Sequence, residues 1–303
     1  MTYVLSVIAL ASVFSLLTLA LNLHFGIAGL INFGIVAYFA IGAYTYAVLT
    51  QPPPSALDKY ALGLELPSSV GVIGGIAMAV LFAALTGWPC LRLRTEYLAL
   101  TTFAFAEVLH SVLLNTREIG NGTRGLSNIL PPFYTTFPIE DYDLWVAGLM
   151  VAILLLATIA MQRLARSPFG ATLRAIRDDE LAAAAIAKPV ARFRLEAFLA
   201  GAALAGFAGI LFAWYTTLVS PDLFTANITF TAFIALVIGG VGSNYGALVG
   251  SFLLFGIQEA IRVVPLSDDA AQLLSSLRPV PFGLALILIL RFRPQGLAGQ
   301  WAV

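Results

Sequence analysis

Few side chains in this sequence could carry out proton transfer or covalent chemistry. Glu107 and His110 lie three residues apart in an apolar stretch, so a helix would place both on one face. A carboxylate beside an imidazole can relay protons, and it can equally form a polar helix face along a water-filled path. Glu259 and Arg262 share this spacing, which favours an internal ion pair. Glu107 and His110 therefore allow either proton transfer or polar contacts with a solute.

Motifs for metal, redox and nucleotide chemistry are missing from this sequence. Two histidines and a single cysteine, Cys90, provide neither a histidine cluster nor a disulfide. The G-x-x-x-x-G-K-S/T phosphate loop of ATPases is absent. Residues 120–125 match G-x-G-x-x-G, but they lie between two apolar stretches, so we expect a glycine-rich turn or a wall of a substrate entrance. No basic stripe interleaved with aromatic residues indicates nucleic-acid binding. We therefore expect no enzyme activity, cofactor or metal in this chain itself.

The composition indicates an integral membrane protein. Hydrophobic residues make up 60% of the 303 residues and charged residues 11%, whereas soluble domains carry about 25% charged residues. The mean hydropathy is +0.92. The apolar runs are continuous, most of them about 20 residues long, which predicts an all-α, polytopic membrane helical bundle of about nine transmembrane helices rather than a barrel. The expected spans are residues 3–21, 27–49, 70–91, 96–115, 143–162, 196–216, 229–246, 247–264 and 279–291. No polar stretch is long enough for a second domain, so residues 1–303 are expected to form one transmembrane domain.

Lysine and arginine are concentrated on one side of the predicted bundle. Alternating the spans places eleven basic residues on one side, seven of them between residues 163 and 194, and four on the other. Because cytoplasmic loops carry an excess of Lys and Arg, we expect the richer side and the C-terminus to face the cytoplasm of a bacterial inner membrane. The first apolar run lacks a basic n-region and a cleavage site, which favours a spanning helix over a signal peptide.

The charged segment of about residues 163–195 is predicted to form a cytoplasmic helical hairpin. Ser167 followed by Pro168 favours a helix start, because the Ser hydroxyl can accept a free backbone N–H and Pro lacks one. A solvated loop that merely obeys the positive-inside rule is the alternative.

A second, alanine-rich helix is predicted in the same segment. Asp178 or Asp179 can cap a helix over residues 180–187, and Pro189 must end or kink it. Because this helix has few large side chains, it could lie close in a groove of another protein.

Polar residues near the second predicted span are candidates for a solute pathway. Asn22, His24 and Asn32 add polarity around the second span, which is also rich in glycine. Ionisable and polar groups inside a membrane are candidates for function. The pathway candidates are Asn22, His24, Asn32, Gly34, Glu107 and His110.

Small residues recur every fourth position in two of the predicted spans. This spacing lets membrane helices approach closely, which can serve packing alone or allow helices to tilt during transport. The first set is Gly242, Gly246 and Gly250, and the second is Gly201, Ala205 and Gly209. We also expect Gly239 and Gly240 to break a helix near the cytosolic face.

The charged segment resembles the coupling segment of the branched-chain amino-acid permease family of bacterial ABC importers. Its matching residues run from Gly170 to Ala183 (GATLRAIRDDELAA). Four further stretches resemble the family in order and spacing: NLHFGIAGLINFGIVAYFAIGAY from residue 22, LRLRTEYLAL from 91, GGVGSNYGALVG from 239 and RPQGL from 293. Relatives usually close the coupling helix with a Gly-Ile-Asn type turn, and this chain has Ala187-Lys188-Pro189 there.

The resemblance implies the membrane subunit of an ATP-driven importer of branched-chain or other neutral amino acids. It implies two cytosolic ABC ATPase subunits that bind ATP and Mg²⁺, a second related permease subunit and an extracytoplasmic substrate-binding protein, with membrane lipid around them. The residues implied in ATPase coupling are Gly170, Arg174, Arg177, Asp178, Asp179 and Glu180. Two alternatives stay open, namely an ABC importer of urea or short amides and a proton-coupled secondary transporter that uses Glu107 and His110.

Overall fold

The structure is a computed structural model that is almost entirely helical. It describes residues 2–54, 60, 62–93, 95–129, 131–132 and 139–263, and the single positions 287, 291, 296 and 297. Its long helices are α1 (Thr2–Leu21), α2 (Ile35–Thr50), α3 (Ser68–Cys90), α4 (Thr95–Asn115), α6 (Ile139–Arg166), α9 (Val190–Thr216), α10 (Ala226–Gly239) and α11 (Asn244–Val263). The short elements are η1 (Asn22–Ile27), α5 (Arg117–Gly120), η2 (Gly122–Arg124), β1 (Leu126–Ser127), α7 (Pro168–Asp178), α8 (Glu180–Ala185), β2 (Leu218–Val219) and η3 (Pro221–Leu223).

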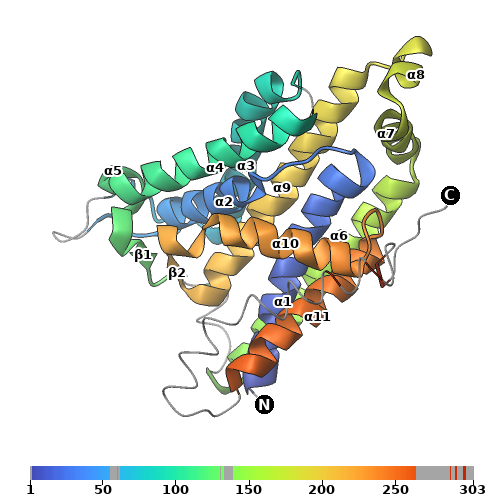
Figure 1. Cartoon of the computed structure of the whole chain (residues 1–303). Coiled ribbons are helices and arrows are strands. Elements are labelled where there is room, and N and C mark those ends of the chain that lie inside the picture. The colour runs from blue at the N-terminus through green and yellow to red at the C-terminus, as the bar shows by residue number, and fades with distance from the viewer. Residues whose placement is uncertain are drawn as a thin grey trace.

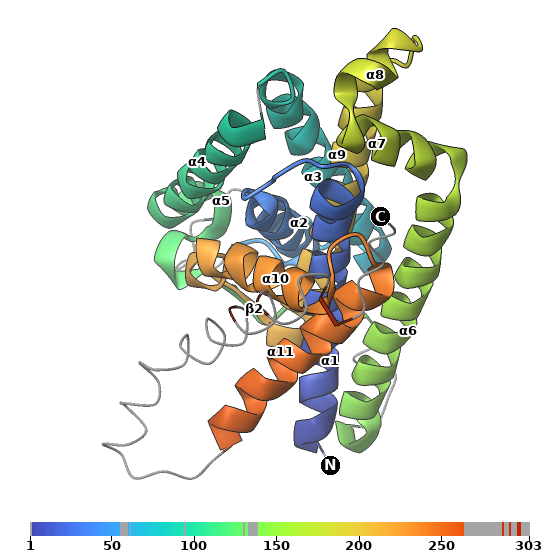
Figure 2. The same cartoon turned by 45° about the vertical axis from the view of Figure 1, so that its right-hand side comes forward.

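Helices α1 and α9 form the centre of the bundle. Helix α9 packs against α1, α2 and α3, and α1 packs in turn against α6 and α11. Buried positions make up 72% of the α9 span and 67% of the first span, against 28% for α3, α4 and α6. Figures 1 and 2 show the hairpin of α7 and α8 at the end of the molecule opposite the N-terminus.

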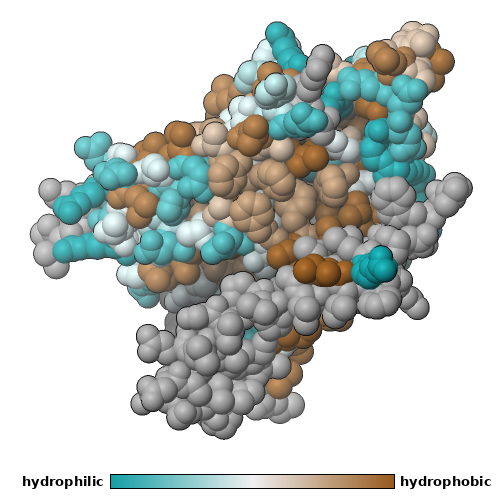
Figure 3. Space-filling view, viewed as in Figure 1, coloured by the Kyte–Doolittle hydropathy of each residue, from teal (hydrophilic) through white to brown (hydrophobic). Residues whose placement is uncertain are grey.

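Hydrophobic side chains cover much of the outer surface. Figure 3 shows them gathered across the middle of one face, with hydrophilic side chains toward α5 and around α7. Six helices among the described residues are long and apolar enough to cross a membrane. They are Tyr3–Ile27, Ser68–Cys90, Glu96–Asn115, Leu144–Arg166, Val190–Thr216 and Pro221–Gly239. The predicted count of nine is not confirmed, because α2 is shorter, α11 is not among the six, and the predicted span 279–291 lies outside the described residues apart from positions 287 and 291.

The second predicted span begins later than the sequence suggested. We expected it from residue 27, but the first helix continues through the π-helical turn η1, and α2 starts only at Ile35. Between them Gly29 adopts a left-handed conformation with φ of 69°. The Asn32 side chain accepts the Gly34 N–H at 2.9 Å. The apolar run is therefore continuous in sequence but interrupted in the backbone, which places Asn22 and His24 at the end of the first span.

The predicted boundary between residues 246 and 247 was also wrong. Helix α10 ends at Gly239, as the two glycines suggested, and α11 already starts at Asn244. Gly240 and Gly242 have φ of 121° and 84°, which glycine adopts without strain. Gly242 therefore belongs to a turn and not to a helix-packing face.

Glycines bring helix backbones into direct contact. A Cβ added at Gly250 would lie 2.0 Å from the Ala235 carbonyl oxygen, and Gly246 likewise faces Gly239, so α10 and α11 pack closely. A Cβ at Gly209 of α9 would lie 1.9 Å from the Phe39 carbonyl oxygen of α2. These contacts require glycine because a larger residue would push the helices apart.

The glycine-rich segment 120–125 forms a compact turn. It runs through the end of α5 and η2 into β1, which pairs antiparallel with β2. The segment therefore lacks the strand-turn-helix order of a dinucleotide site, which agrees with its position between two apolar stretches of the sequence.

Candidate functional site

The hairpin of α7 and α8 has the two helix caps that its sequence predicts. The Ser167 Oγ accepts the Gly170 N–H at 3.3 Å, and Pro168 occupies the first turn of α7. The Asp179 Oδ1 accepts the Ala182 N–H at 3.0 Å and caps α8. A Cβ on Gly170 would lie 2.5 Å from the carbonyl oxygens of the preceding turn, so the chain can fold back sharply from α6 into α7.

Helix α8 is two residues shorter than the predicted range 180–187, so it ends before Pro189 can stop it. Its last helical residue is Ala185, and Ala187 adopts a left-handed conformation with φ of 59°. The Lys188 N–H donates to the Ala183 carbonyl at 3.2 Å and the Ala187 N–H to the Ala184 carbonyl at 3.0 Å. These two bonds define a Schellman motif, in which glycine usually occupies the left-handed position.

Glu180 ties the start of α8 to α9. Both of its carboxylate oxygens accept hydrogen bonds from the Arg194 Nη1 at 3.0 Å. The Arg194 side chain is only 10% exposed, whereas that of Glu180 is 55% exposed. The position of α8 therefore depends on the nearly buried guanidinium of Arg194, close to the start of α9.

Two arginines of α7 hold different neighbours. Arg174 donates from Nη1 to the Ala165 carbonyl at 2.6 Å, in the last turn of α6. Arg177 donates from Nη1 to the Gly26 carbonyl in η1, 151 residues away. Its guanidinium also pairs with Asp178 at 2.9 Å. Arg177 thus links the hairpin to the end of the first span.

The glycines around Arg177 leave room for this link. A Cβ at Gly29 would lie 2.6 Å from the Arg177 Cγ. At Gly242 it would lie 3.9 Å from the Arg177 Nη1. The side chain therefore lies between the end of the first span and the turn that joins α10 to α11.

Four of the pathway candidates lie in two buried polar clusters between helices, one around Asn22 and the other around His24 and Asn32. Asn22 donates to the Asn244 Oδ1 at 2.8 Å and accepts the Gly242 N–H at 2.8 Å. The two ring nitrogens of His24 lie 3.0 Å from the Phe198 carbonyl and 3.2 Å from the Asn32 Nδ2. Asn22, His24 and Asn32 are fully buried, and a Cβ on Gly34 would lie 2.3 Å from the Thr102 carbonyl oxygen. In this conformation their polar groups stabilise the contact between η1, α9 and α11, and a role in a pathway stays a prediction.

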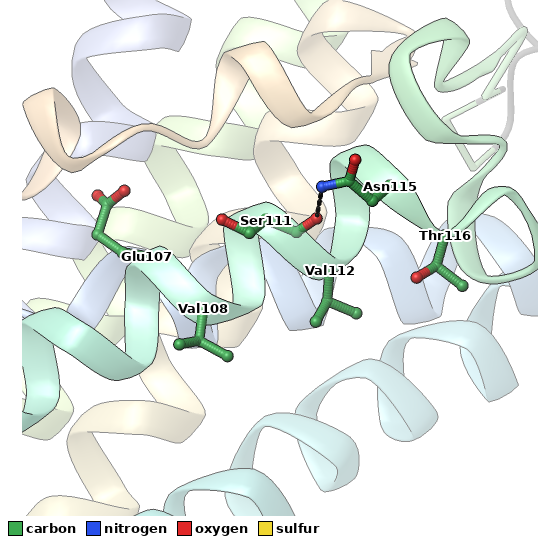
Figure 4. A pocket seen from close by; sticks show the side chains of 6 residues that line it. All are labelled: Glu107, Val108, Ser111, Val112, Asn115 and Thr116. Carbon is green, nitrogen blue, oxygen red and sulfur yellow. Dashed lines mark hydrogen bonds between the residues drawn. The ribbon is translucent and has the colours of Figure 1, made fainter.

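Helix α4 carries a polar stripe on its outer face. Glu107, Ser111 and Asn115 recur every fourth residue, and all three are exposed. They help to line a shallow hollow of about 440 Å³. Figure 4 shows Glu107 and Asn115 on one side of α4, with Val108 and Val112 on the other, and the Asn115 Nδ2 donates to the Ser111 carbonyl at 2.8 Å.

Glu107 and His110 both lie on α4, but the structure does not join them directly. Both residues are described, and no ion pair joins them among the described residues. The His110 Nε2 is buried without a hydrogen-bond partner in the same part of the chain. The predicted pair Glu259 and Arg262 lies on the last turn of α11, outside the side chains that the structure describes.

Comparisons with known proteins identify the family. The family described as "Branched-chain amino acid transport system / permease component" matches residues 3–290. The chain belongs to this permease family. The permease is 32% identical to the high-affinity branched-chain amino acid transport system permease protein LivM of Escherichia coli (strain K12), over 95% of this chain and 68% of that protein. A probable LivM of Methanocaldococcus jannaschii is 27% identical over 93% of this chain and 89% of its own length.

A second type of relative covers nearly all of the permease. The LivH permease protein of Salmonella typhimurium is 27% identical over 97% of this chain and 93% of its own length. No solved structure matches the permease. The relatives are transport permeases, which agrees with the importer interpretation and does not favour the proton-coupled alternative.

Sequence reasoning missed the long-range contacts of the site. The bond from Arg177 to Gly26 and that from Asn22 to Asn244 join residues more than 150 positions apart. In the sequence, these contacts are indicated only by polar side chains near glycines at helix ends. That pattern does not predict which residues pair.

Proposed function

We propose that this permease imports branched-chain or other neutral amino acids as part of an ATP-driven complex. The observation that carries the proposal is the family match over residues 3–290, together with relatives named for branched-chain amino acid transport. The bundle supplies the membrane crossing, and the chain contains no phosphate-binding loop for ATP. The energy must therefore come from another subunit.

The α7–α8 hairpin is proposed to receive that energy in the cytoplasm. It lies at the end of the molecule opposite the N-terminus (Figure 1). The last turn of α7 and the start of α8 present Asp178, Asp179 and Glu180, all exposed. Two ABC ATPase subunits, which would bind ATP and Mg²⁺, would move the hairpin when they close. Arg177 would pass the movement to η1 through its bond to the Gly26 carbonyl.

The outer stripe of α4 is proposed to face a solute pathway shared with a second, related permease subunit. Glu107 lies in the middle of a span, where a charged side chain facing lipid costs about 2.5–3.5 kcal/mol. Because Glu107 is exposed on this subunit, a water-filled path or a partner must cover it in the membrane. Ser111 and Asn115 extend the same polar face by two helical turns. An extracytoplasmic binding protein would deliver the amino acid to this path.

Reconstituted uptake tests the proposal. The permease, its paralogous partner and the ATPase are placed in liposomes with the binding protein and radiolabelled leucine. We expect uptake that requires ATP and all four components. Uptake driven by a proton gradient without the ATPase would refute the importer interpretation. Stronger competition by urea or acetamide than by isoleucine or valine would refute the substrate class and favour the amide alternative.

The α4 stripe is tested in the same assay with a matched pair of variants. Glu107→Gln removes the carboxylate inside the span, and Glu118→Gln removes an exposed carboxylate beyond the end of α4. Loss of a charge-assisted contact should raise the KM for uptake about tenfold in Glu107→Gln. The Glu118→Gln variant should retain the wild-type KM. Equal KM values in both variants would remove Glu107 from the pathway.

A further inference from the structure

The end of α6 carries arginines that form no ion pair with the acidic residues that the structure describes. Arg163 and Arg166 are both exposed. Neither takes part in any of the ion pairs among the residues that the structure describes. Basic residues at a helix end can serve only to orient the helix in the membrane. Further features are therefore needed to indicate a ligand.

Two neighbouring hollows lie beside these arginines. One, of about 320 Å³, is lined by Ile159, Gln162, Arg163, Arg166, Ser167 and Tyr245. The other, of about 470 Å³, extends toward α7 and the turn before α11 and shares Gln162, Arg166 and Tyr245 with the first. None of the described residues that line the first hollow is acidic. In the second the acidic residue is Asp178, which Arg177 already neutralises.

An apolar stripe leads directly to the arginines. Leu156, Ile159, Arg163 and Arg166 follow one another at intervals of three or four residues, so they lie on one face of α6. Leu156 is 67% exposed and Ile159 is 51% exposed. Tyr245, 56% exposed, stands at the same level as the arginines, and tyrosines prefer the boundary between lipid and water.

We propose that this face binds an anionic phospholipid, with its phosphate at Arg163 and Arg166 and its acyl chains along Leu156 and Ile159. Arginine forms paired hydrogen bonds with phosphate oxygens. Arg166 also donates from Nε and Nη2 to the side-chain oxygen of Gln162, at 3.2 and 3.3 Å, so a phosphate would compete with this neutral hydrogen bond and not with an ion pair among the described residues. The apolar stripe distinguishes a lipid from inorganic phosphate, because only the lipid has chains to cover it. Basic pockets at the ends of membrane helices are suited to such headgroups.

Lipid binding to the purified full-length permease tests this site. Native mass spectrometry measures the binding of phosphatidylglycerol and of phosphatidylcholine with identical acyl chains. The double variant Arg163→Ala/Arg166→Ala is compared with Lys188→Ala/Arg192→Ala, which removes two cations from the hairpin end but none from α6. We expect the first variant to bind phosphatidylglycerol about 30-fold more weakly, as follows from the loss of two interfacial cations. Its binding of phosphatidylcholine should stay unchanged, as should both lipids with the second variant.

Three results would overturn the proposal. Equal affinity of the wild-type protein for the two lipids would show that no anion is selected. An equal loss of phosphatidylglycerol binding in both double variants would indicate net charge rather than a site. Displacement of the lipid by millimolar inorganic phosphate would assign the arginines to a free phosphate and not to a membrane lipid.

Discussion

Replacing Arg177 should weaken the coupling of ATP hydrolysis to uptake while leaving hydrolysis intact. Arg177→Ala removes the donor to the Gly26 carbonyl, which joins α7 to η1. A hydrogen bond from a charged group contributes about 1.5–3 kcal/mol. Because the Arg177 side chain is 33% exposed, the lower value applies, about 1.5 kcal/mol. This energy corresponds to about a tenfold change.

The assay measures leucine taken up per ATP hydrolysed in liposomes that contain the whole complex. Arg192→Ala is the matched control, since Arg192 is also an exposed arginine of this segment, but its ion pair at 2.7 Å is with Glu196 of the same helix, α9. We expect about a tenfold lower ratio for Arg177→Ala alone. The reasoning would be refuted by a normal ratio in that variant, or by an equal loss in the Arg192 variant.

Three further predictions concern stability, each measured by thermal unfolding of the purified chain. Ala187→Gly should stabilise the protein by about 0.5–1 kcal/mol, because glycine relieves the left-handed strain at φ of 59°; a lower melting temperature would contradict the Schellman ending of α8. Gly209→Ala should destabilise it by about 3 kcal/mol, because the new Cβ would meet the Phe39 carbonyl oxygen at 1.9 Å. Gly148→Ala is the control, because no atom lies within 4 Å of the added Cβ, and it should leave the stability unchanged or raise it. An equal loss of stability in the two variants would contradict the close contact between Gly209 and the Phe39 backbone. Asp179→Ala should cost about 1 kcal/mol through loss of the α8 cap, whereas an unchanged melting temperature would show that the cap is dispensable.

Local chemistry of single residues predicted much of the hairpin. Ser167, Pro168 and Asp179 lie at the helix starts that their types favour, because a cap depends only on neighbours within three residues. The end of α8 was predicted less well. Alanine carries no signal for a left-handed backbone, so the sequence pointed to Pro189 while the Schellman bonds end the helix at Ala185.

Hydropathy predicted the membrane helices but misplaced an interruption. The sequence suggested a break between residues 21 and 27, whereas the π-helical turn continues the first span through Ile27 and α2 starts only at Ile35. The break after Gly239 was predicted from its glycines, but the start of the next helix was placed too late. The start at Asn244 is supported by the Asn22–Asn244 bond, which depends on how distant helices pack. The resemblance to permeases indicated the family, whereas no sequence pattern paired Arg177 with Gly26.

The exposed carboxylate of Glu107 has a consequence for the life of the unassembled protein. If the proposed second permease subunit covers Glu107, a copy that enters the membrane before this partner would leave the exposed side chain facing hydrocarbon, at a cost of about 2.5–3.5 kcal/mol. In such a copy α4 would be less stable in the bilayer. Local unfolding of α4 would expose the protein to membrane proteases. The amount of permease in the cell would then follow the supply of its partner subunit rather than its own rate of synthesis.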